Sequence, residues 1–261
     1  SDFLAYEDIG STSRIAPGML PFAWDAKDAS IASIALSKTY CWLITGRART
    51  GKTNLLKVLA SSAALIPSQR YIVDLSGNRL RAFAAQNQAA YVSDGMGIFE
   101  LLKELVPVFK ERNAKKQELA ASGLDEADIY WKQNQFPPIY LFIDDLDEFM
   151  KVVYAPPEGV GAMSGFVENI TEKGSLHNIY FIACFDCSSP GQSAGRKAFT
   201  NMTSYRTGIH LGGNPAGQRI FDFSSLPYSE QSKPVQPGIG LIPPGEYDST
   251  VQKVVIPLVK G

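Results

Sequence analysis

The sequence has little of what marks secreted, membrane-spanning or duplex-binding proteins. It contains three cysteines in 261 residues, an odd and small number that cannot build the disulfide framework of a secreted domain. No apolar run approaches the ~20 residues that a membrane-spanning helix needs, and no basic-then-apolar signal peptide is present. The formal net charge is −1, so the basic excess of a nucleic-acid-binding surface is missing. We therefore expect a reducing, intracellular location, with nucleic acid disfavoured as a partner.

The composition is that of an ordinary folded domain. Hydrophobic residues make up 45% and charged residues 20%, which excludes disorder as the main state. The length allows one large domain or two small ones. The chain begins with Ser1 rather than Met, and we expect a piece of a larger protein whose membrane anchor lies outside it.

Short apolar segments alternate with helix-like segments from residue 40 onward. The apolar segments are rich in β-branched and aromatic residues, which is typical of buried parallel strands. The alternation predicts an α/β domain with a mainly parallel central sheet flanked by helices. The predicted strands are Tyr40–Thr45, Arg70–Leu75, Ile139–Asp144, Asn178–Cys184 and Tyr205–Leu211, and the predicted helices span residues 52–65, 97–119, 162–173 and 194–202.

The two ends of the chain lack this alternation. Residues 1–38 are mixed in composition, and we expect a lead-in that packs on the core, residues 39–261, within a single domain of residues 1–261. Residues 225–247 contain five prolines and predict a loop. Val251–Val259 predicts a closing strand, placed at a sheet edge because Pro257 cannot donate to a neighbouring strand.

Residues 46–53 match the P-loop (Walker A) pattern at every fixed position. In that pattern, backbone N–H groups and the N-terminus of the following helix bind phosphates. We expect Lys52 to reach the β- and γ-phosphates and the Thr53 hydroxyl to bind Mg²⁺, which predicts ATP and Mg²⁺ as cofactors. The alternative is a coincidental glycine turn before a helix. The predicted nucleotide-binding residues are Gly46, Arg47, Ala48, Arg49, Thr50, Gly51, Lys52 and Thr53.

A second phosphate-site element follows the strand predicted at 139–144. This strand leads directly into Asp144 and Asp145, the arrangement of a Walker B strand whose carboxylate holds the magnesium shell. Side chains alternate along a strand, so the two acids are expected to point to opposite faces. We assign Asp144 to Mg²⁺, together with Thr53. The alternative is a strand that simply ends in acidic turn residues.

The stretch Tyr71–Leu80, with Asp74 ending a strand and Gly77 in the following turn, resembles the second strand of type VII secretion ATPases. Residues from about 18 to 259 are similar to the FtsK/SpoIIIE superfamily, most closely to the ATPase modules of EssC (YukB-like) and EccC proteins. The resemblance continues through Phe109 and Arg112 on a charged helix, Pro137-Pro138, the Asp144-Asp145 strand end, the strands at 179–184 and 205–211, and Arg219.

The resemblance implies a RecA-like P-loop NTPase (ASCE) fold and an ATP-binding module, the last of a multi-module chain. That chain would be membrane-anchored through a segment outside this one, at the cytoplasmic face, and would drive or regulate export of small helical-hairpin proteins. Other ATPase modules, the exported proteins and a homo-hexamer are the implied partners. Asp145 stands where relatives place the carboxylate that polarises the attacking water, and Arg219 where they present an arginine to a neighbour's nucleotide.

Three departures from the family pattern predict slow hydrolysis and leave an ATP hydrolase activity open. Phe185-Asp186 replaces a Thr-Gln pair that senses the γ-phosphate in DNA-pumping members, and an acid there repels phosphate. Arg47 and Arg49 replace small residues of the P-loop, and Asp145 is shorter than Glu. Two alternative functions follow: a DNA translocase of the same superfamily, and a pseudo-ATPase that serves as a docking domain for exported proteins.

The remaining motifs each allow a plain interpretation. Cys184-x-x-Cys187 is either a redox or zinc element, completed by His177 or His210, or strand-end packing. The charged run 110–118 is either a solvated helix face with a Glu111–Lys115 pair or a nucleic-acid contact. Arg219 is otherwise a surface arginine on a short helix, with Arg196 and Arg206 as weaker finger candidates. Ile129–Trp131 and Met150–Tyr154 form a groove for an exported helical tail, or they cover the sheet.

Overall fold

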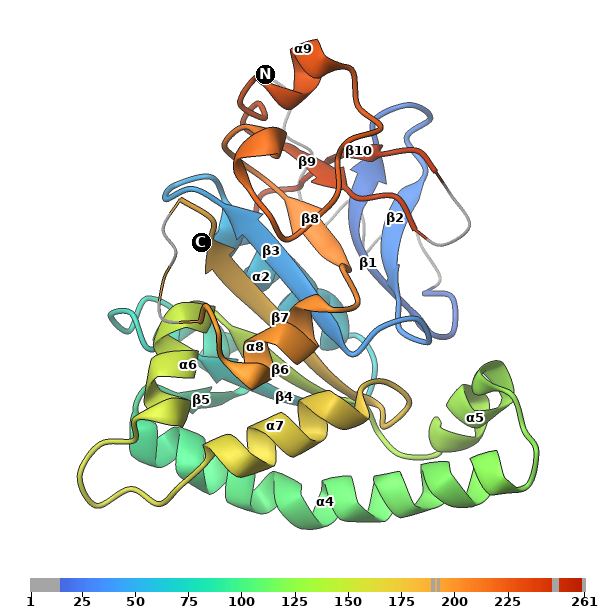
Figure 1. Cartoon of the computed structure of the whole chain (residues 1–261), viewed down its shortest axis with the longest axis vertical. Helices are drawn as coiled ribbons and strands as arrows, with labels where there is room; N and C mark the ends of the chain where they lie inside the picture. Colours follow the sequence, from blue (N-terminus) through green and yellow to red (C-terminus); the bar gives the residue numbers. More distant parts are fainter. Residues whose placement is uncertain (1–14, 189–190, 192, 246–248, 260–261) are drawn as a thin grey trace.

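The computed structural model describes residues 15–188, 191, 193–245 and 249–259. Within these residues the strands form one sheet in the order β2-β1-β10-β9-β8-β3-β7-β6-β4-β5 (Figure 1). The strands are β1 (Met19–Asp25), β2 (Ile31–Ala35), β3 (Cys41–Gly46), β4 (Gln69–Val73), β5 (Ala90–Val92), β6 (Ile139–Ile143), β7 (Ile179–Asp186), β8 (Gly208–His210), β9 (Ile239–Ile242) and β10 (Gln252–Val255). The helices are α2 (Lys52–Ala63), α3 (Arg81–Gln86), α4 (Gly95–Ala121), α5 (Glu126–Gln133), α6 (Leu146–Tyr154), α7 (Ser164–Lys173), α8 (Lys197–Thr203), the 3₁₀ turn η1 (Pro215–Gly217) and α9 (Tyr228–Gln231).

One half of the sheet is parallel. Strands β8, β3, β7, β6, β4 and β5 pair in parallel with one another. Five strands of this half were predicted, with bounds that differ by up to three residues, and β5 was not. The predicted α/β class is confirmed. Parallel strands joined through helices are covered on both faces, which explains why β3 and β6 are buried along their whole length.

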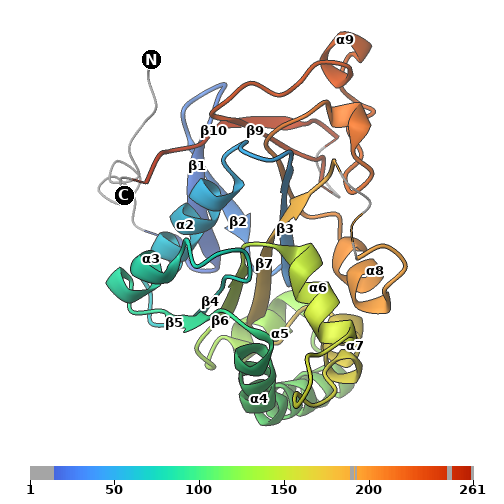
Figure 2. The same ribbon diagram turned by 90° about the vertical axis from the view of Figure 1, so that its left-hand side faces the viewer.

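Two apolar cores lie on the two faces of the sheet. Trp42 and Ile44 of β3 face the core built with α2 and α3, whereas Cys41 and Leu43 face the core built with α4, α6, α7 and α8. Figure 2 shows these two groups of helices on opposite sides of the strands. The alternation along β3 follows the two-residue period of a strand, and both sets of side chains are apolar because both faces are covered.

The other half of the sheet is antiparallel and was largely missed by the sequence analysis. Residues 19–35, expected only as a lead-in, form the hairpin β1–β2, and β1 pairs with β10. The predicted loop 225–247 contains α9 and β9. The predicted edge position of the closing strand is wrong, because β10 lies between β9 and β1. Proline does not prevent this, since β10 ends at Val255, two residues before Pro257.

Three short helices, α3, α5 and α6, were not predicted. The burial of α5 and α6 side chains shows that the predicted groove for a helical tail is wrong. Ile129 and Tyr130 of α5 are buried, and so are Met150 and Val153 of α6. These side chains form part of the two cores, so they cover the sheet instead of lining an apolar groove. Trp131, by contrast, is 52% exposed.

The charged run 110–118 lies on α4 and is only partly solvated. Arg112 is buried and donates to the backbone carbonyls of His177, Asn178 and Pro137, so it ties α4 to two loops. Lys115 pairs with Glu118 at 3.0 Å, three residues away, in place of the expected partner Glu111. None of the described helices is long and apolar enough to cross a membrane.

Candidate functional site

The loop 46–51 connects the end of β3 to the start of α2. Gly51 precedes the helix with a φ of +93°, and Arg49 has a φ of +63°, both in the left-handed region that suits glycine. A Cβ on Gly46 would lie 2.5 Å from Oγ1 of Thr50, so a larger residue there would push the loop open. The glycines at both ends therefore allow the tight turn.

The N-terminus of α2 has no capping side chain and no acidic residue of its own to bind its N–H groups. Gly51 provides no side-chain cap, and the first turn of the helix contains no acidic residue. The first N–H groups of a helix have no partner within the helix and bear partial positive charge. This end of α2 is therefore suited to bind an anion.

Lys52 lies over the loop that precedes it. Its Nζ donates to the carbonyl oxygens of Gly46 at 3.1 Å and Arg47 at 2.6 Å, and Oγ1 of Thr50 donates to the same Arg47 carbonyl at 2.8 Å. These contacts hold the ammonium group beside the helix N-terminus, where it adds a full positive charge.

Thr53 and Asp144 join the P-loop helix to the end of β6. Oγ1 of Thr53 donates to Oδ1 of Asp144 at 2.8 Å, and Nη2 of Arg79 lies 3.2 Å from Oδ2. Burial raises the pKa of Asp144, and the Thr53 hydrogen bond and the Arg79 charge partly oppose this rise. A hydroxyl and a carboxylate at this distance form an oxygen donor set of the kind that Mg²⁺ prefers.

Asp145 lines the same pocket as Asp144, so the expectation of opposite faces is wrong. Strand β6 ends at Ile143, and the chain turns into α6, for which Asp145 is the N-cap residue. Asp145 accepts from the backbone N–H of Glu148 at 3.1 Å and from Oγ of Ser76 at 3.2 Å.

Asp74 shapes the loop that brings Ser76 and Arg79 to the site. Its buried carboxylate accepts from the backbone N–H of Leu80 at 2.9 Å and from the hydroxyl of Tyr91 at 3.0 Å. From the sequence, Asp74 marked only the family resemblance, and Ser76 and Arg79 were not predicted as site residues. The signal for them was their place directly after Asp74, but no fixed spacing rule describes that loop.

Asp186, at the end of β7, also lines this pocket. Burial raises its pKa, but hydrogen bonds from Ser188 and the positive charges of Lys52 and Arg47 outweigh that effect, so the pKa lies below the usual value. An ionised carboxylate therefore stands beside the lysine of the P-loop.

These groups line one pocket of about 510 Å³, which we call the polar pocket. Its volume lies within the range of small-molecule sites. Gly46, Arg47 and Thr50 shape the loop without lining the pocket, and Arg219 does not line it either. The lining residues are Ala48, Arg49, Gly51, Lys52, Thr53, Asn54, Ser76, Arg79, Asp144, Asp145, Cys184 and Asp186.

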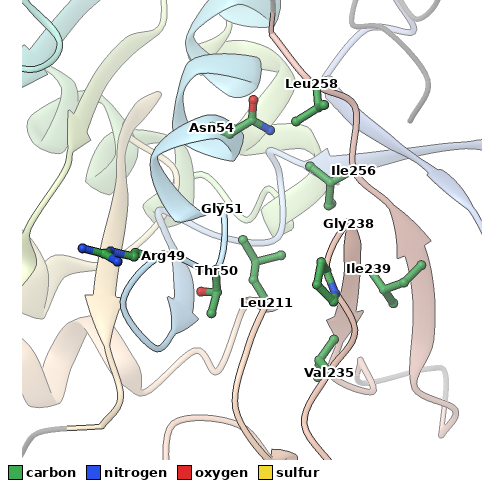
Figure 3. Close-up of a pocket in the computed structure, with 11 residues that line it drawn as sticks. Arg49, Thr50, Gly51, Asn54, Leu211, Val235, Gly238, Ile239, Ile256 and Leu258 are labelled. Atoms are coloured by element: carbon green, nitrogen blue, oxygen red, sulfur yellow. The ribbon is translucent and has the colours of Figure 1, made fainter. Parts of the chain in front are cut away.

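A second pocket of about 270 Å³ adjoins the first, and we call it the apolar pocket (Figure 3). It shares Arg49, Gly51 and Asn54 with the polar pocket. The sequence analysis did not predict it, because its walls come from segments far apart in the chain. The other lining residues are Thr50, Leu211, Val235, Pro237, Gly238, Ile239, Ile256 and Leu258.

The arginine candidates lie away from the P-loop. Arg219 is exposed on a bend after η1, not on a helix, and it lines a separate cavity of about 830 Å³ together with Arg206. Arg196 precedes α8 and its guanidinium lies 4.8 Å from the ring centre of Tyr154. A role of Arg219 toward a neighbouring subunit's nucleotide stays a prediction.

Of the Cys184-x-x-Cys187 pair, Cys184 lines the polar pocket and Cys187 does not. Cys184 packs in the core with α2, and burial raises the pKa of its thiol. Both cysteines are free, and the described residues hold no group of three or more His, Cys, Asp or Glu suited to a metal. His210 is bound instead to Thr45, with Nδ1 2.9 Å from Oγ1.

The sheet order and the site together define a P-loop ATPase fold of the RecA-like type. Strand β7 lies between the P-loop strand β3 and the acidic strand β6, with β4 beyond them. A strand inserted between the two phosphate-site strands is the RecA-like arrangement, so the RecA-like fold that the resemblance implied is confirmed.

Solved structures of secretion and conjugation ATPases share this fold. The cytoplasmic domain of EssC matches with a TM-score of 0.79 and 19% identity, over 100% of this chain and 48% of that one. EccC (ATPases 2 and 3) of Thermomonospora curvata, in complex with a signal sequence peptide, matches with a TM-score of 0.70 and 14% identity, over 99% and 44%. The pCW3 conjugation coupling protein TcpA, a monomer form with ATPγS, matches with a TM-score of 0.65 and 15% identity, over 97% and 70%.

The likeness lies in the fold. No family model and no curated protein matches this sequence. The chain spans less than half the length of the EssC and EccC chains that it matches. The resemblance to EssC and EccC ATPase modules therefore holds at the level of the fold, and the activity and partners of the longer proteins do not follow from it.

Proposed function

We propose that this chain is an ATP-binding module that takes ATP together with Mg²⁺ in the polar pocket. The observation that supports this most is the 2.8 Å hydrogen bond between Thr53 and Asp144, which places a P-loop hydroxyl and a buried carboxylate side by side. Lys52 and the N-terminus of α2 would hold the phosphates. Thr53 and Asp144 would hold Mg²⁺, which neutralises and bridges phosphate oxygens.

Hydrolysis in this proposal is slow for an isolated chain. Asp145 is the group that would orient a water molecule, but both of its oxygens already accept hydrogen bonds, from Glu148 and Ser76. Asp186 adds a negative charge where a transferring phosphoryl group also gains charge. Arg219 would act only on the nucleotide of a neighbouring subunit, in an assembly such as a hexamer.

The proposed setting is a type VII secretion ATPase at the cytoplasmic face of the membrane. One of the named relatives in fold, EccC, is a chain with more than one ATPase, and its solved structure is in complex with a signal sequence peptide. Other ATPase modules of a longer chain and exported helical-hairpin proteins are therefore the proposed partners, with membrane attachment through a segment outside this sequence. A pseudo-ATPase docking domain is a variant of this proposal, supported by Asp186.

A DNA translocase is the second candidate. The fold likeness to the conjugation coupling protein TcpA favours it, whereas the net charge of −1 opposes it, because duplex binding relies on neutralising phosphates. Salt-dependent binding of duplex DNA by this chain would favour the translocase over the secretion module.

Calorimetric titration with ATP, with and without Mg²⁺, tests the proposed binding. Lys52→Ala removes the charge that pairs with phosphate and should weaken ATP binding by about 10- to 100-fold, since hydrogen bonds to charged groups contribute about 1.5–3 kcal/mol. Lys132→Ala, at an exposed position of α5, is the matched control and should bind like the wild type. Equal affinity in wild type and Lys52→Ala, or no binding by the wild type, would refute the proposal.

A further inference from the structure

Asn54 links the P-loop helix to the segment 256–259. It directly follows Thr53, and its side chain spans the backbone on both sides of Leu258. Nδ2 donates to the carbonyl of Pro257 at 2.8 Å, and Oδ1 accepts from the N–H of Val259 at 3.0 Å. One side chain thus satisfies both a donor and an acceptor of an irregular segment and holds it across the first turn of α2.

The segment held by Asn54 forms one wall of the apolar pocket. Ile256 and Leu258 line this wall, opposite Leu211, as Figure 3 shows. The neighbouring wall is fixed by backbone hydrogen bonds from Ile256 to Gly238 at 2.9 Å and from Val235 to Gly213 at 3.2 Å. The side chain of Leu258 is 47% exposed, so part of its apolar surface is available to contact a ligand.

The side chains of the apolar pocket are suited to bury a flat apolar group. Of the three polar lining residues, Thr50 donates to the carbonyl of Arg47 and Asn54 is engaged with the segment 256–259. The remaining one, Arg49, is shared with the polar pocket. Apolar contact, not side-chain hydrogen bonding, is therefore the main interaction that this pocket offers.

The two pockets meet at Gly51 and Asn54, at the N-terminus of α2. Asp144 and Asp145 line only the polar pocket, whereas Arg49, Gly51 and Asn54 line both pockets. A molecule whose phosphates lie against that N-terminus and Lys52 therefore has the apolar pocket next to it, beside Gly51 and Asn54.

Resting on the ATP binding proposed above, we propose that the apolar pocket takes the base and ribose of the nucleotide and that Asn54 is a positioning residue. Asn54 completes this pocket by holding Leu258 over the ligand through Pro257 and Val259, while Ile256 is held by its backbone hydrogen bond to Gly238. Nucleotide affinity is then coupled to the docking of the segment 256–259, and release of this segment lowers affinity for the nucleoside part without changing the phosphate site.

The test compares MgATP with magnesium tripolyphosphate, which has phosphates and no nucleoside, by calorimetry on the full 261-residue chain. The wild type should bind ATP at least about tenfold more tightly than tripolyphosphate, because only ATP buries apolar surface. Asn54→Ala should remove most of that difference, so it should weaken ATP binding by a larger factor than tripolyphosphate binding. Asn54→Asp keeps the acceptor for the Val259 N–H. Its ratio of ATP affinity to tripolyphosphate affinity should therefore lie between the ratios of the wild type and Asn54→Ala.

A second pair of variants does not depend on how well Asn54→Ala folds. Leu258→Ser should weaken ATP binding by about fivefold with no change for tripolyphosphate. Leu65→Ser is the matched control, because Leu65 is 54% exposed beyond the opposite end of α2, and it should change neither affinity.

The outcomes separate the two proposals. If the wild type binds neither ligand, ATP binding itself is refuted. If it binds ATP and tripolyphosphate equally well, or if Asn54→Ala and Leu258→Ser weaken both ligands by the same factor, the chain binds phosphate and the nucleoside pocket is refuted. A selective loss of ATP affinity in these two variants supports the proposal.

Discussion

The polar pocket and the apolar pocket share the N-terminus of α2 but are built in different ways. The polar pocket is lined by the P-loop, by residues that follow β4 and β6, and by residues at the end of β7, at the carboxyl edge of the parallel half of the sheet. Most of the apolar pocket comes from residues after β8, before β9 and after β10, in and beside the antiparallel half. The parallel half thus provides charge at a fixed edge, and the antiparallel addition provides apolar walls.

This difference indicates two separable sources of affinity. Charge pairing and helix-terminus contacts act on phosphate, whereas burial of apolar surface acts on the remainder of a ligand. Substitutions in one pocket should therefore leave the other contribution intact. Lys52→Ala and Asn54→Ala test the two pockets directly, and four further experiments sharpen the comparison, from the largest expected effect to the smallest.

Asp144→Asn should remove the enhancement of ATP binding by Mg²⁺, a loss of about 10- to 100-fold in apparent metal affinity. The asparagine retains the shape of the side chain but lacks the charge that a divalent cation needs. Titration of the variant with ATP in magnesium and in a chelator measures this loss. A variant that keeps the full magnesium effect would remove Asp144 from the metal site.

The same substitution should not reduce stability at pH 7. The raised pKa of Asp144 is due first to burial, so ionisation of this group opposes folding. Its favourable contribution is present below the unfolded-state pKa of about 3.9 and is lost as pH rises through the folded pKa. Thermal melting of Asp144→Asn at pH 7 should therefore give a Tm equal to or above that of the wild type, and a clear decrease would contradict this reasoning.

Asp186→Asn should increase ATP affinity by about threefold, because it removes a negative charge near Lys52 from a partly exposed site. The low pKa of Asp186 means that the charge is present throughout the neutral range. Ser188 can still donate to the asparagine oxygen, so the end of β7 should keep its shape. Unchanged or weaker ATP binding would show that Asp186 does not face the phosphates.

ATP and GTP should bind with affinities within about threefold of each other. The apolar pocket can bury either purine. Its Thr50 and Asn54 side chains already make hydrogen bonds within the protein. These two side chains therefore do not provide the base-specific hydrogen bonds that strong discrimination between ATP and GTP requires. Competition between the two nucleotides measures the ratio. A preference above about 30-fold would mean that backbone groups or Arg49 read the base.

Prediction from the sequence succeeded where the signal was local. Residues 46–53 form a contiguous motif, and the strands of the parallel half are short apolar runs whose signal does not depend on distant partners. Prediction failed for β1, β2 and β9 in and beside the antiparallel half, and also for the short strand β5 in the parallel half. Pro21 and the neighbouring turn residues obscured the first two, and Gly240 obscured the third, although a Cβ there would come 2.3 Å from Ile209. The glycine fits because a distant strand approaches closely, which no local pattern reveals.

The amino-acid sequence by itself was enough to predict a phosphate site in this protein. A glycine turn, a lysine and a threonine lie within eight consecutive residues, and an acidic pair ends a buried strand, so residue type and short spacing were enough. Only the tertiary structure decided that Asp144 and Asp145 share one pocket, that Asp74 brings Ser76 and Arg79 to it, and that Asn54 meets residues 257–259 some two hundred positions later. The physical reason is that these contacts depend on sheet order and chain path, which are properties of the whole fold.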